Sequence, residues 1–532
     1  MLQNDTAHAR HDSSMVNPGS DSGRKSPGAA EDDMHRSFLN LDESQDSCTT
    51  SSDSTRTSLS GEDRTTPDVA SEAPSDERGY SFDNLVERLL ALPKSKADSR
   101  FAAVFLALYR KFAPPGQLLE AIVLRFESLD KDEVAFMART VSQLRYLSVI
   151  EQWIGTYPGD FAHPKTRRRM RTFVAKISGT RIFTAASKEM SSDLDKVSED
   201  DDTNWACCDK DYDQAGLQVG ITWTSRGSTL LDDPSFDFSD NLGSLSLDGR
   251  PNNMPANPLP SDYGVLHDVQ SARKQAQSLI PVPRGLISKL HWRALLDIPT
   301  DVIAREMTRI DWTMFSAIRP RDFVRHVSLS TEQKKACSSL IHVDAMINHF
   351  NFLRDWVANF VLIRDKAKHR VQMLEKLMQI ARKLRELNNY NSLGAFLAGI
   401  NSAAIHRLNT TRELLQPDIA KDWMKLEILM SSSRSHSAYR LAWDNSSGER
   451  IPYIPLVRRD LVAAEQGNKT FIGEEADGRI NWRKFEVIGD VVIGIQRAQG
   501  LPYRASTLGT RHDDVKTLVL NNAFAYKDDE VS

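Results

Sequence analysis

The stretch HFNFLRDWVAN, residues 349–359, decides the fold class of this chain. It lies inside a longer apolar stripe over residues 343–363 that includes Trp356. A second stripe, over residues 366–388, places apolar side chains on one side and Arg and Lys on the other. Apolar residues at this spacing indicate amphipathic helices. The pattern continues over about 280–505 and strand signals are scarce, so the sequence predicts an all-α fold with one large helical domain.

A smaller helical region precedes this domain, over residues 78–178. Apolar side chains recur there at helical spacing, as in the run from Phe101 to Phe112, which prolines at 114 and 115 end. Asp98 is the expected N-cap of that helix, because its carboxylate can accept a hydrogen bond from a free backbone N–H. The sequence therefore predicts a compact N-terminal domain of about five helices.

Three segments lack such patterning: residues 1–77, 179–275 and 506–532. The first is rich in Ser, Thr and Asp, and the second contains acidic, Gly/Ser and Pro/Asn runs. Such compositions bury too little apolar surface to offset the entropy of ordering. We expect a disordered tail, a disordered linker or insertion, and a C-terminal tail. Serines beside basic residues, such as Ser26, are candidate phosphorylation sites, and a merely solvated tail is the alternative.

Composition narrows the class of protein. The 532 residues carry 68 basic and 72 acidic side chains, a net charge of −4, which argues against a chain built mainly to bind nucleic acid. The four cysteines have no C-x-x-C spacing, and we expect neither a disulfide framework nor a zinc site. No apolar run is long enough to cross a bilayer, and the first residues do not resemble a signal peptide. We expect a cytoplasmic protein without metal or cofactor.

No motif of bond-making catalysis is present. G-x-x-x-x-G-K-[ST], H-E-x-x-H and G-x-S-x-G are all missing from the sequence. One dense basic cluster, Lys165 to Arg171, could contact the phosphates of lipids or nucleic acids. The alternative is a solvated helix face opposite Met170, Phe173 and Val174.

A polar block interrupts the large domain at RELNNYNSL, residues 385–393. Asn has a poor helix propensity, and a buried amide must find hydrogen-bond partners. The block is therefore either an interhelical turn with satisfied Asn side chains or a polar junction that holds the framework or faces a partner.

With these blocks in view, the region over about 280–505 resembles the catalytic domain of the Ras-family guanine nucleotide exchange factors (RasGEF). The region over 78–178 is similar to the Ras exchanger motif that accompanies it, with its best match over residues 105–112. The motifs that carry the resemblance, in order, are residues 304–315, 318–320, 350–356, 387–393, 400–402, 451–453, 460–462, 465–468, 480–481, 495–496 and 501–503.

The resemblance implies a mechanism without covalent chemistry, so the chain is not expected to be an enzyme in that sense. An exchange factor of this family binds a small GTPase, opens its nucleotide site and lets GDP leave so that GTP can enter. A helical hairpin, here about Val457 to Ile495, moves a switch segment of the GTPase. The upstream domain supports the hairpin in relatives.

The family's two catalytic positions on the hairpin fall on Val462 and Gln466. The first is an apolar side chain that occludes the Mg²⁺ site, and Val is shorter than the usual Leu. The second is normally acidic, but here the carboxylate stands one residue earlier, at Glu465. One residue turns a helical side chain by about 100°, so Glu465 does not simply replace Gln466. We expect a hairpin that excludes Mg²⁺ and perturbs phosphate less strongly; plain solvent-facing residues are the alternative.

The resemblance also implies a pocket that grips a switch residue of the GTPase. Gly394 is smaller than the usual apolar residue there, and His436 replaces a more common aromatic. Ordinary core packing is the alternative for each position. The expected GTPase-binding residues are Ile347, Asn348, Gly394, Asn401, His406, His436, Tyr439, Tyr453, Arg459 and Asn468.

Three functions remain open at this point. The first is an exchange factor whose partner is a Ras-family GTPase, acting transiently at the inner face of membranes through peripheral recruitment. The second is a RasGEF-like scaffold that binds a GTPase without efficient exchange, which Val462 and Gln466 keep open. The third is a nucleic-acid binder using residues 165–171, which would show a steep salt dependence.

Overall fold

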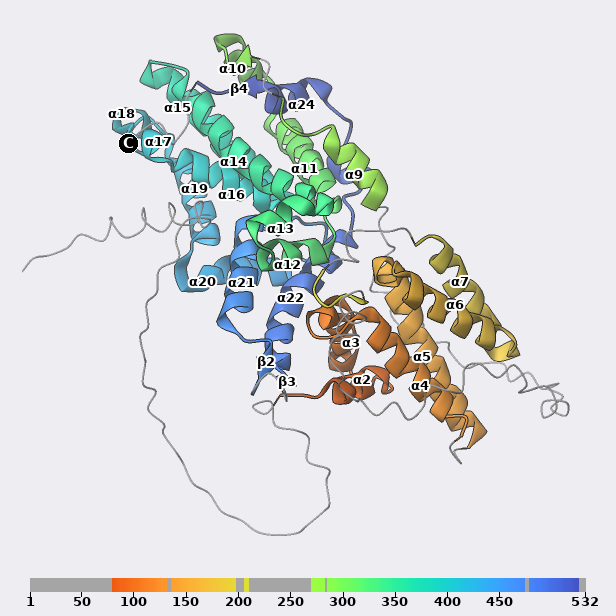
Figure 1. Ribbon diagram of the computed structural model, residues 1–532. Helices are drawn as coiled ribbons and strands as arrows, with labels where there is room; N and C mark the ends of the chain where they lie inside the picture. The colour runs from red at the N-terminus through yellow and green to blue at the C-terminus, as the bar shows by residue number, and fades with distance from the viewer. Residues whose placement is uncertain are drawn as a thin grey trace, which may run out of the picture. The chain divides into compact units, whose positions relative to one another are not determined.

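The computed structural model describes residues 79–131, 135–197, 205–209, 269–282, 285–473 and 478–525. All of them belong to Ala73–Ser532, the second of two units into which the chain divides. The expected tail over 1–77, with its candidate phosphorylation sites, lies outside the described residues, as does most of the expected linker. The described residues are mainly helical, which confirms the all-α prediction (Figure 1).

The N-terminal domain is built from amphipathic helices whose apolar sides meet in one core. The core is aromatic: the Phe126 ring lies 5.3 Å from that of Phe173, and the Trp153 ring lies 4.6 Å from that of Phe161. Its elements are α2 (Phe82–Leu90), α3 (Lys96–Leu108), η2 (Tyr109–Lys111), α4 (Pro115–Ser128), α5 (Phe136–Thr156), η3 (Pro158–Phe161), α6 (Pro164–Ser178), η4 (Arg181–Phe183) and α7 (Thr184–Asp195).

Helix α3 begins earlier than the sequence predicted. Its N-cap is Ser95, whose hydroxyl accepts a hydrogen bond from the Asp98 N–H at 3.3 Å. The Asp98 carboxylate in turn accepts from the Ser95 N–H at 3.1 Å, which completes a capping box. Asp98 is therefore the third helical residue and not the cap, and the hydrogen bond from the Lys94 N–H is the main reason that its pKa is lowered.

The domain also extends past the predicted boundary at residue 178. Phe183, Met190 and Leu194 are buried, so part of the expected linker over 179–275 folds as η4 and α7. Ser, Lys and Asp surround these apolar residues and obscured their spacing. A short segment, residues 205–209, is also fixed, because the Trp205 carbonyl accepts a hydrogen bond from Arg110 Nη2 at 2.8 Å.

The larger domain is a helical assembly with minor strand pairs. β1 (Gly285–Leu286) pairs in parallel with β4 (Asn522–Ala523), and β2 (Phe471–Ile472) pairs antiparallel with β3 (Arg479–Ile480). Its elements are α9 (Val269–Gln277), β1 (Gly285–Leu286), α10 (Lys289–Asp297), α11 (Thr300–Ser316), α12 (Pro320–Ser328), α13 (Thr331–Ala336), η6 (Ser338–Leu340), α14 (Ile341–Leu362), α15 (Ala367–Glu386), α16 (Tyr390–Ile400), α17 (Ala403–His406), α18 (Asn409–Arg412), α19 (Pro417–Met430), α20 (Ser433–Asn445), α21 (Ile454–Gly467), β2 (Phe471–Ile472), β3 (Arg479–Ile480), α22 (Trp482–Gln499), α23 (Ala505–Leu508), α24 (Asp513–Leu520) and β4 (Asn522–Ala523).

Helices α14, α15 and α16 pack against one another to form the centre of this domain (Figure 1). Trp356 of α14 is fully buried and lies 4.5 Å from the ring of Phe360. Its indole N–H donates to the Leu518 carbonyl at 3.1 Å. Residue 518 belongs to α24, so the first part of the expected C-terminal tail over 506–532 is folded. The buried Val515 and Val519 explain why.

The Asn-rich block proves to be an interhelical turn whose amides are largely hydrogen-bonded, although the buried Asn391 Oδ1 has no partner among the described residues. Asn388 adopts a positive φ of 53°, which Asn tolerates better than most residues, and this ends α15. Asn389 caps α16 by accepting from the Ser392 N–H at 3.0 Å, and the Ser392 hydroxyl donates to Asp311 at 2.6 Å. Asn389, Ser392 and Asp311 are fully buried. The buried side chains of the block therefore hold the framework.

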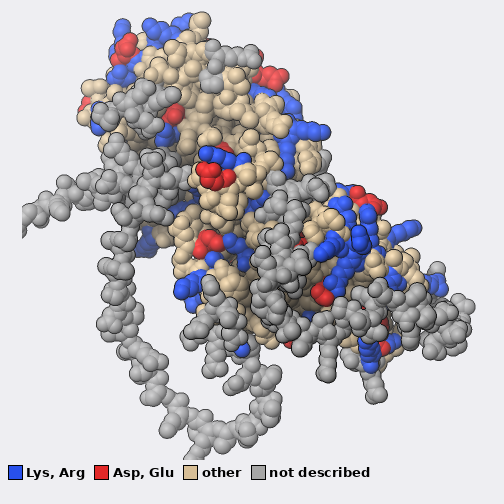
Figure 2. All heavy atoms as spheres, viewed as in Figure 1, with Lys and Arg blue, Asp and Glu red and all other residues tan. Residues whose placement is uncertain are grey.

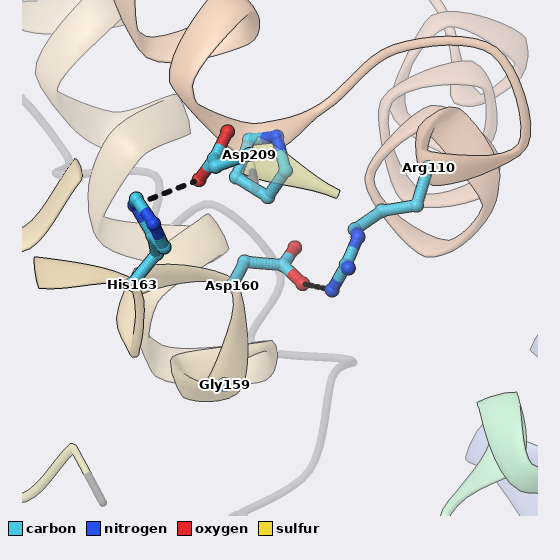
Figure 3. Close-up of a pocket in the computed structure, with 6 residues that line it drawn as sticks. Arg110, Gly159, Asp160, His163 and Asp209 are labelled. Atoms are coloured by element: carbon cyan, nitrogen blue, oxygen red, sulfur yellow. Dashed lines mark hydrogen bonds and ion pairs between the residues drawn. The ribbon is translucent and has the colours of Figure 1, made fainter. Parts of the chain in front are cut away.

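Among the contacts that join the N-terminal helices to the larger domain, two are deeply buried. The first is the packing of α3 on α22, where a Cβ added to Gly489 would lie 2.5 Å from Val104 Cγ2. The second is a buried ion cluster around Asp160 of η3. Its carboxylate accepts from Arg110 at 3.1 Å and from Arg321 of α12 at 2.8 Å. Figure 3 shows the Arg110 part of this cluster, with His163 turned towards Asp209.

Candidate functional site

The predicted hairpin is formed by α21 and α22, which pack against each other and are linked through β2 and β3 (Figure 1). The first helix starts at Ile454, earlier than the expected Val457, with Pro455 in its first turn. It ends at Gly467, and Asn481 is the N-cap of the return helix. The side of α21 that packs into the domain carries the buried residues Ile454, Leu456, Val457, Leu461 and Ala464.

The three predicted catalytic residues point to two different sides of α21: two are accessible at the surface and one points inward. Gln466 is exposed and Val462 is half-buried one turn before it, so both are accessible on α21. Glu465 points the other way, into a cationic contact. Its carboxylate oxygen Oε1 lies 2.6 Å from Lys111 Nζ and 3.5 Å from Lys484 Nζ. This geometry separates Glu465 from the outer pair.

Lys111 belongs to the N-terminal domain, so its contact with Glu465 links that domain to the hairpin. The ammonium group also donates to the Ser328 hydroxyl at 2.9 Å, at the end of α12. The Lys111 and Glu465 side chains are only 10% and 17% exposed. Charge-assisted hydrogen bonds are strongest where water is largely excluded. No sequence pattern indicates this link, because residues 111 and 465 meet only in the folded chain.

The predicted pocket residues Gly394, Tyr453, His436 and Tyr439 do come together. A Cβ added to Gly394 would lie 2.5 Å from Tyr453 Cε2, so the absent side chain is what admits the Tyr453 ring. That ring lies 6.0 Å from the His436 ring and 6.1 Å from the Tyr439 ring. Phe350 completes the group, with its ring 6.0 Å from that of Tyr453.

Burial governs the ionisation of this aromatic group. It raises the pKa of Tyr453 to about 12, although the nearby positive charge of Arg459 lowers it. Burial also raises the pKa of Tyr439. Burial, followed by the charge of Arg459, lowers the pKa of His436, so this imidazole is neutral at neutral pH. Tyr453 is at the same time the N-cap of α21, and its N–H donates to the Tyr439 hydroxyl at 3.0 Å. The aromatic group and the hairpin therefore share one residue.

A strained turn contains His436, one residue of this aromatic group. Arg434, Ser435 and His436 have φ values of 48°, 56° and 58°, a left-handed conformation that costs roughly 1–2 kcal/mol for each residue with a Cβ. Arg440 donates through Nε to the Ser435 carbonyl at 2.9 Å and through Nη2 to Asp460 of α21 at 2.6 Å. Arg440 thus ties the strained turn to the hairpin, a role without any sequence motif.

The remaining predicted residues lie at the surface. Asn348, His406 and Asn468 are exposed, and Ile347 and Arg459 are half-buried. Asn401 is also exposed and donates to Glu427 at 2.9 Å. Within the described ranges, no hydrogen bond or ring contact joins Asn401 or His406 to the aromatic pocket or to the hairpin. The described contacts therefore join the aromatic group to the hairpin but do not include Asn401 or His406.

The described residues contain no cluster of three or more His, Cys, Asp or Glu side chains suited to a metal ion. None of the described helices has the length and apolar character needed to cross a bilayer.

Comparison with known proteins matches both helical domains. A RasGEF N-terminal motif matches residues 77–173, and a RasGEF domain matches residues 302–486. Ras guanine nucleotide exchange factor A of Dictyostelium discoideum is 25% identical over 427 residues, which is 80% of this chain and 58% of that protein. Ras guanine nucleotide exchange factor K of the same organism is 34% identical over 235 residues, 43% of this chain and 14% of that protein.

A mammalian relative shows the same likeness. Rap guanine nucleotide exchange factor 5 of Mus musculus is 26% identical over 267 residues, which is 49% of this chain and 32% of that protein. The chain spans less than two thirds of the length of these curated relatives. The two matched regions occur in the same order as the two helical domains of the structure. The chain belongs to the RasGEF family, with a RasGEF N-terminal motif followed by a RasGEF domain.

Proposed function

We propose that the chain accelerates GDP release from a small GTPase of the Ras or Rap type. The observation that carries the proposal is the geometry of the hairpin. Val462 and Gln466 are accessible one turn apart on α21, while Glu465 forms ion pairs with Lys111 of the N-terminal domain and Lys484 of α22. Family membership and the names of relatives, which include Ras and Rap exchange factors, give the class of partner.

The mechanism proposed is differential binding. The hairpin and the pocket favour the nucleotide-free conformer of the GTPase, so nucleotide and exchange factor each weaken the affinity of the other. In this scheme Val462 excludes Mg²⁺ from its site. Gln466 offers an amide to the phosphate-binding groups of the GTPase but no negative charge, so its effect on phosphate is weaker than that of a carboxylate. No bond is made or broken in the chain itself.

The direct test is release of fluorescently labelled GDP from purified Ras, Rap, Ral and Rheb-type GTPases. The proposal predicts faster release from at least one GTPase, proportional to the concentration of the chain at low concentration. Binding to a GTPase without faster release would contradict exchange and favour the scaffold function. One observation supports that second candidate: the carboxylate next to Gln466, that of Glu465, is held by Lys111 and Lys484 and does not face outward.

Gln466→Glu is expected to raise the GDP release rate on a responsive GTPase by several-fold. The added carboxylate would stand at an exposed position and form charge-assisted hydrogen bonds, which are about twice as strong as neutral ones. Stopped-flow release with labelled GDP measures the change. Gln275→Glu, the same substitution at an exposed position of α9, is the control and should leave the rate unchanged. An unaltered rate for Gln466→Glu would contradict a phosphate-directed role for this position.

Lys111→Met is expected to lower the maximal release rate by about tenfold while the affinity for the GTPase changes little, because part of the ~1.5–3 kcal/mol of a charged hydrogen bond orients the hairpin. Lys111→Arg keeps the charge and should retain most of the rate. A double-mutant cycle with Glu465→Gln measures the coupling between the two side chains, expected at about 1 kcal/mol or more. Additive effects would show that the contact does not orient the hairpin.

A further inference from the structure

The outer face of α6 is strongly basic and belongs to none of the contacts described so far. Met170, Phe173 and Val174 are buried, as the sequence predicted for the inner side of this helix. The opposite side carries Arg168 at its centre. Figure 2 shows Lys and Arg side chains gathered where Figure 1 places α6. The cations of this face are Lys165, Arg168, Arg169, Arg171 and Lys176, with Arg181 just beyond the helix.

Acidic neighbours balance only part of this charge. Three ion pairs lie along the edges of the helix: Arg169 with Glu120 of α4 at 3.0 Å, Arg171 with Asp195 of α7 at 3.1 Å, and Lys176 with Glu127 of α4 at 2.9 Å. Within the described part of the chain, neither Arg168 nor Arg181 forms an ion pair, and both are exposed. The face, called the α6 basic face below, therefore keeps a net positive charge.

Two aliphatic side chains are exposed beside these cations. Leu124 of α4 is 54% exposed and lies one helical turn from both Glu120 and Glu127, whose carboxylates reach α6. Ile182 is 49% exposed and precedes the buried Phe183. Exposure of Leu and Ile to water is unfavourable. These side chains suit a binding partner whose surface is charged on the outside and apolar beneath.

We propose that the α6 basic face binds the surface of membranes that contain anionic phospholipids. Lys and Arg would contact the lipid headgroups, while Leu124 and Ile182 would enter the boundary between headgroups and acyl chains. This would place the N-terminal domain on the membrane by its own side chains. The inference is independent of the proposed exchange activity, because no residue of the α6 basic face belongs to the hairpin or the pocket.

Nucleic acid fits the face less well. Its phosphates would satisfy the cations, but the bases of a single strand stack on exposed aromatic rings, and Phe126, Phe173 and Phe183 beside α6 are buried. A nucleic acid would also leave Leu124 and Ile182 in contact with polar groups. The acidic run Glu199 to Asp202 in the same chain is another possible occupant, and its neutralisation is an arm of the test.

The test is flotation of the full chain with vesicles of phosphatidylcholine, with and without about a third of phosphatidylserine. Binding is expected only with phosphatidylserine and should weaken as salt is added. Arg168→Gln with Arg181→Gln should lower the partition coefficient about 25-fold, since each cation near such a surface contributes about fivefold. Leu124→Ser with Ile182→Ser should lower it at all salt concentrations.

The matched control is Lys368→Gln with Lys421→Gln, two exposed cations elsewhere in the chain, and it should bind as the wild type does. GDP release in solution without vesicles should be the same for all variants, which separates this proposal from the proposed function. Three results would overturn it: no binding to phosphatidylserine, equal losses in the control, or tighter binding to an RNA or DNA duplex than to vesicles. Binding that appears only after neutralising residues 199–202 would assign the face to that acidic run instead.

Discussion

Asp160→Asn is expected to lower the free energy of unfolding by about 3–5 kcal/mol, because it removes a partner charge shared by two buried guanidinium groups. Arg110 and Arg321 are each 1% exposed, and both reach the Asp160 carboxylate within 3.1 Å. The carboxylate also accepts from the Trp153 indole at 2.8 Å. Urea unfolding followed by far-UV circular dichroism measures the loss.

The same cluster predicts how stability depends on pH. Burial alone would raise the pKa of Asp160, but the charges of Arg321 and Arg110 outweigh burial and lower the pKa to about 2. The pKa in the folded chain is thus below the unfolded value of 3.8. The carboxylate therefore contributes its full stability above about pH 4, and this contribution is lost as the pH falls towards about 2.

The control is Asp195→Asn, which removes an ion pair with Arg171 on the surface of the same domain. The Asp195 side chain is 70% exposed, and such surface pairs contribute about 0–1 kcal/mol. Equal losses for the two variants would contradict the assignment of Asp160 as the buried centre of the contact between the domains. Asp160→Asn should also have a flatter stability profile than the wild type in acid.

Gly394→Val is expected to lower the GDP release rate by at least about tenfold, because the new side chain would displace Tyr453 from its place against α16. The first carbon alone would lie 2.5 Å and 2.8 Å from two atoms of the Tyr453 ring. The ring has little freedom to retreat. Its own backbone caps α21 and is hydrogen-bonded to Tyr439, so a shift of Tyr453 also moves the start of the hairpin.

A second substitution distinguishes displacement of the Tyr453 ring from general destabilisation of the domain. Tyr453→Leu in the Gly394→Val background removes most of the overlap and should restore part of the rate. Gly448→Val is the matched control, since a Cβ added to Gly448 meets nothing within 4 Å. Comparable rates for wild type and Gly394→Val on a responsive GTPase would show that the fit of Tyr453 against Gly394 has no part in exchange.

The periodic parts of the fold were predictable, and the irregular parts were not. Trp356 lies in a strong apolar stripe and is buried, as the sequence predicted. Met190 and Leu194 are also buried, but charged and small residues around them concealed α7. The sequence pattern did not predict the C-terminal α24 for a related reason. This helix is short and depends on tertiary contacts, including the hydrogen bond from the Trp356 indole. Short helices have little intrinsic stability and are set by packing.

For the candidate site, sequence motifs located the hairpin and the pocket but not their connections. They placed Val462, Gln466 and Glu465 next to one another, and the structure turns Glu465 inward to Lys111. They did not reveal Arg440, which joins the strained turn to Asp460. The assignment of these residues to exchange remains a prediction.

The sequence by itself determined the helical class, the order of the two domains and the likeness to one family, because apolar periodicity and local motifs are properties of neighbouring residues. Only the tertiary structure decided which charges meet: Asp160 with Arg321, and Glu465 with Lys111. These partners stand far apart in the chain. Their interaction depends on distances of a few ångströms and on the exclusion of water, and both arise only when the helices pack.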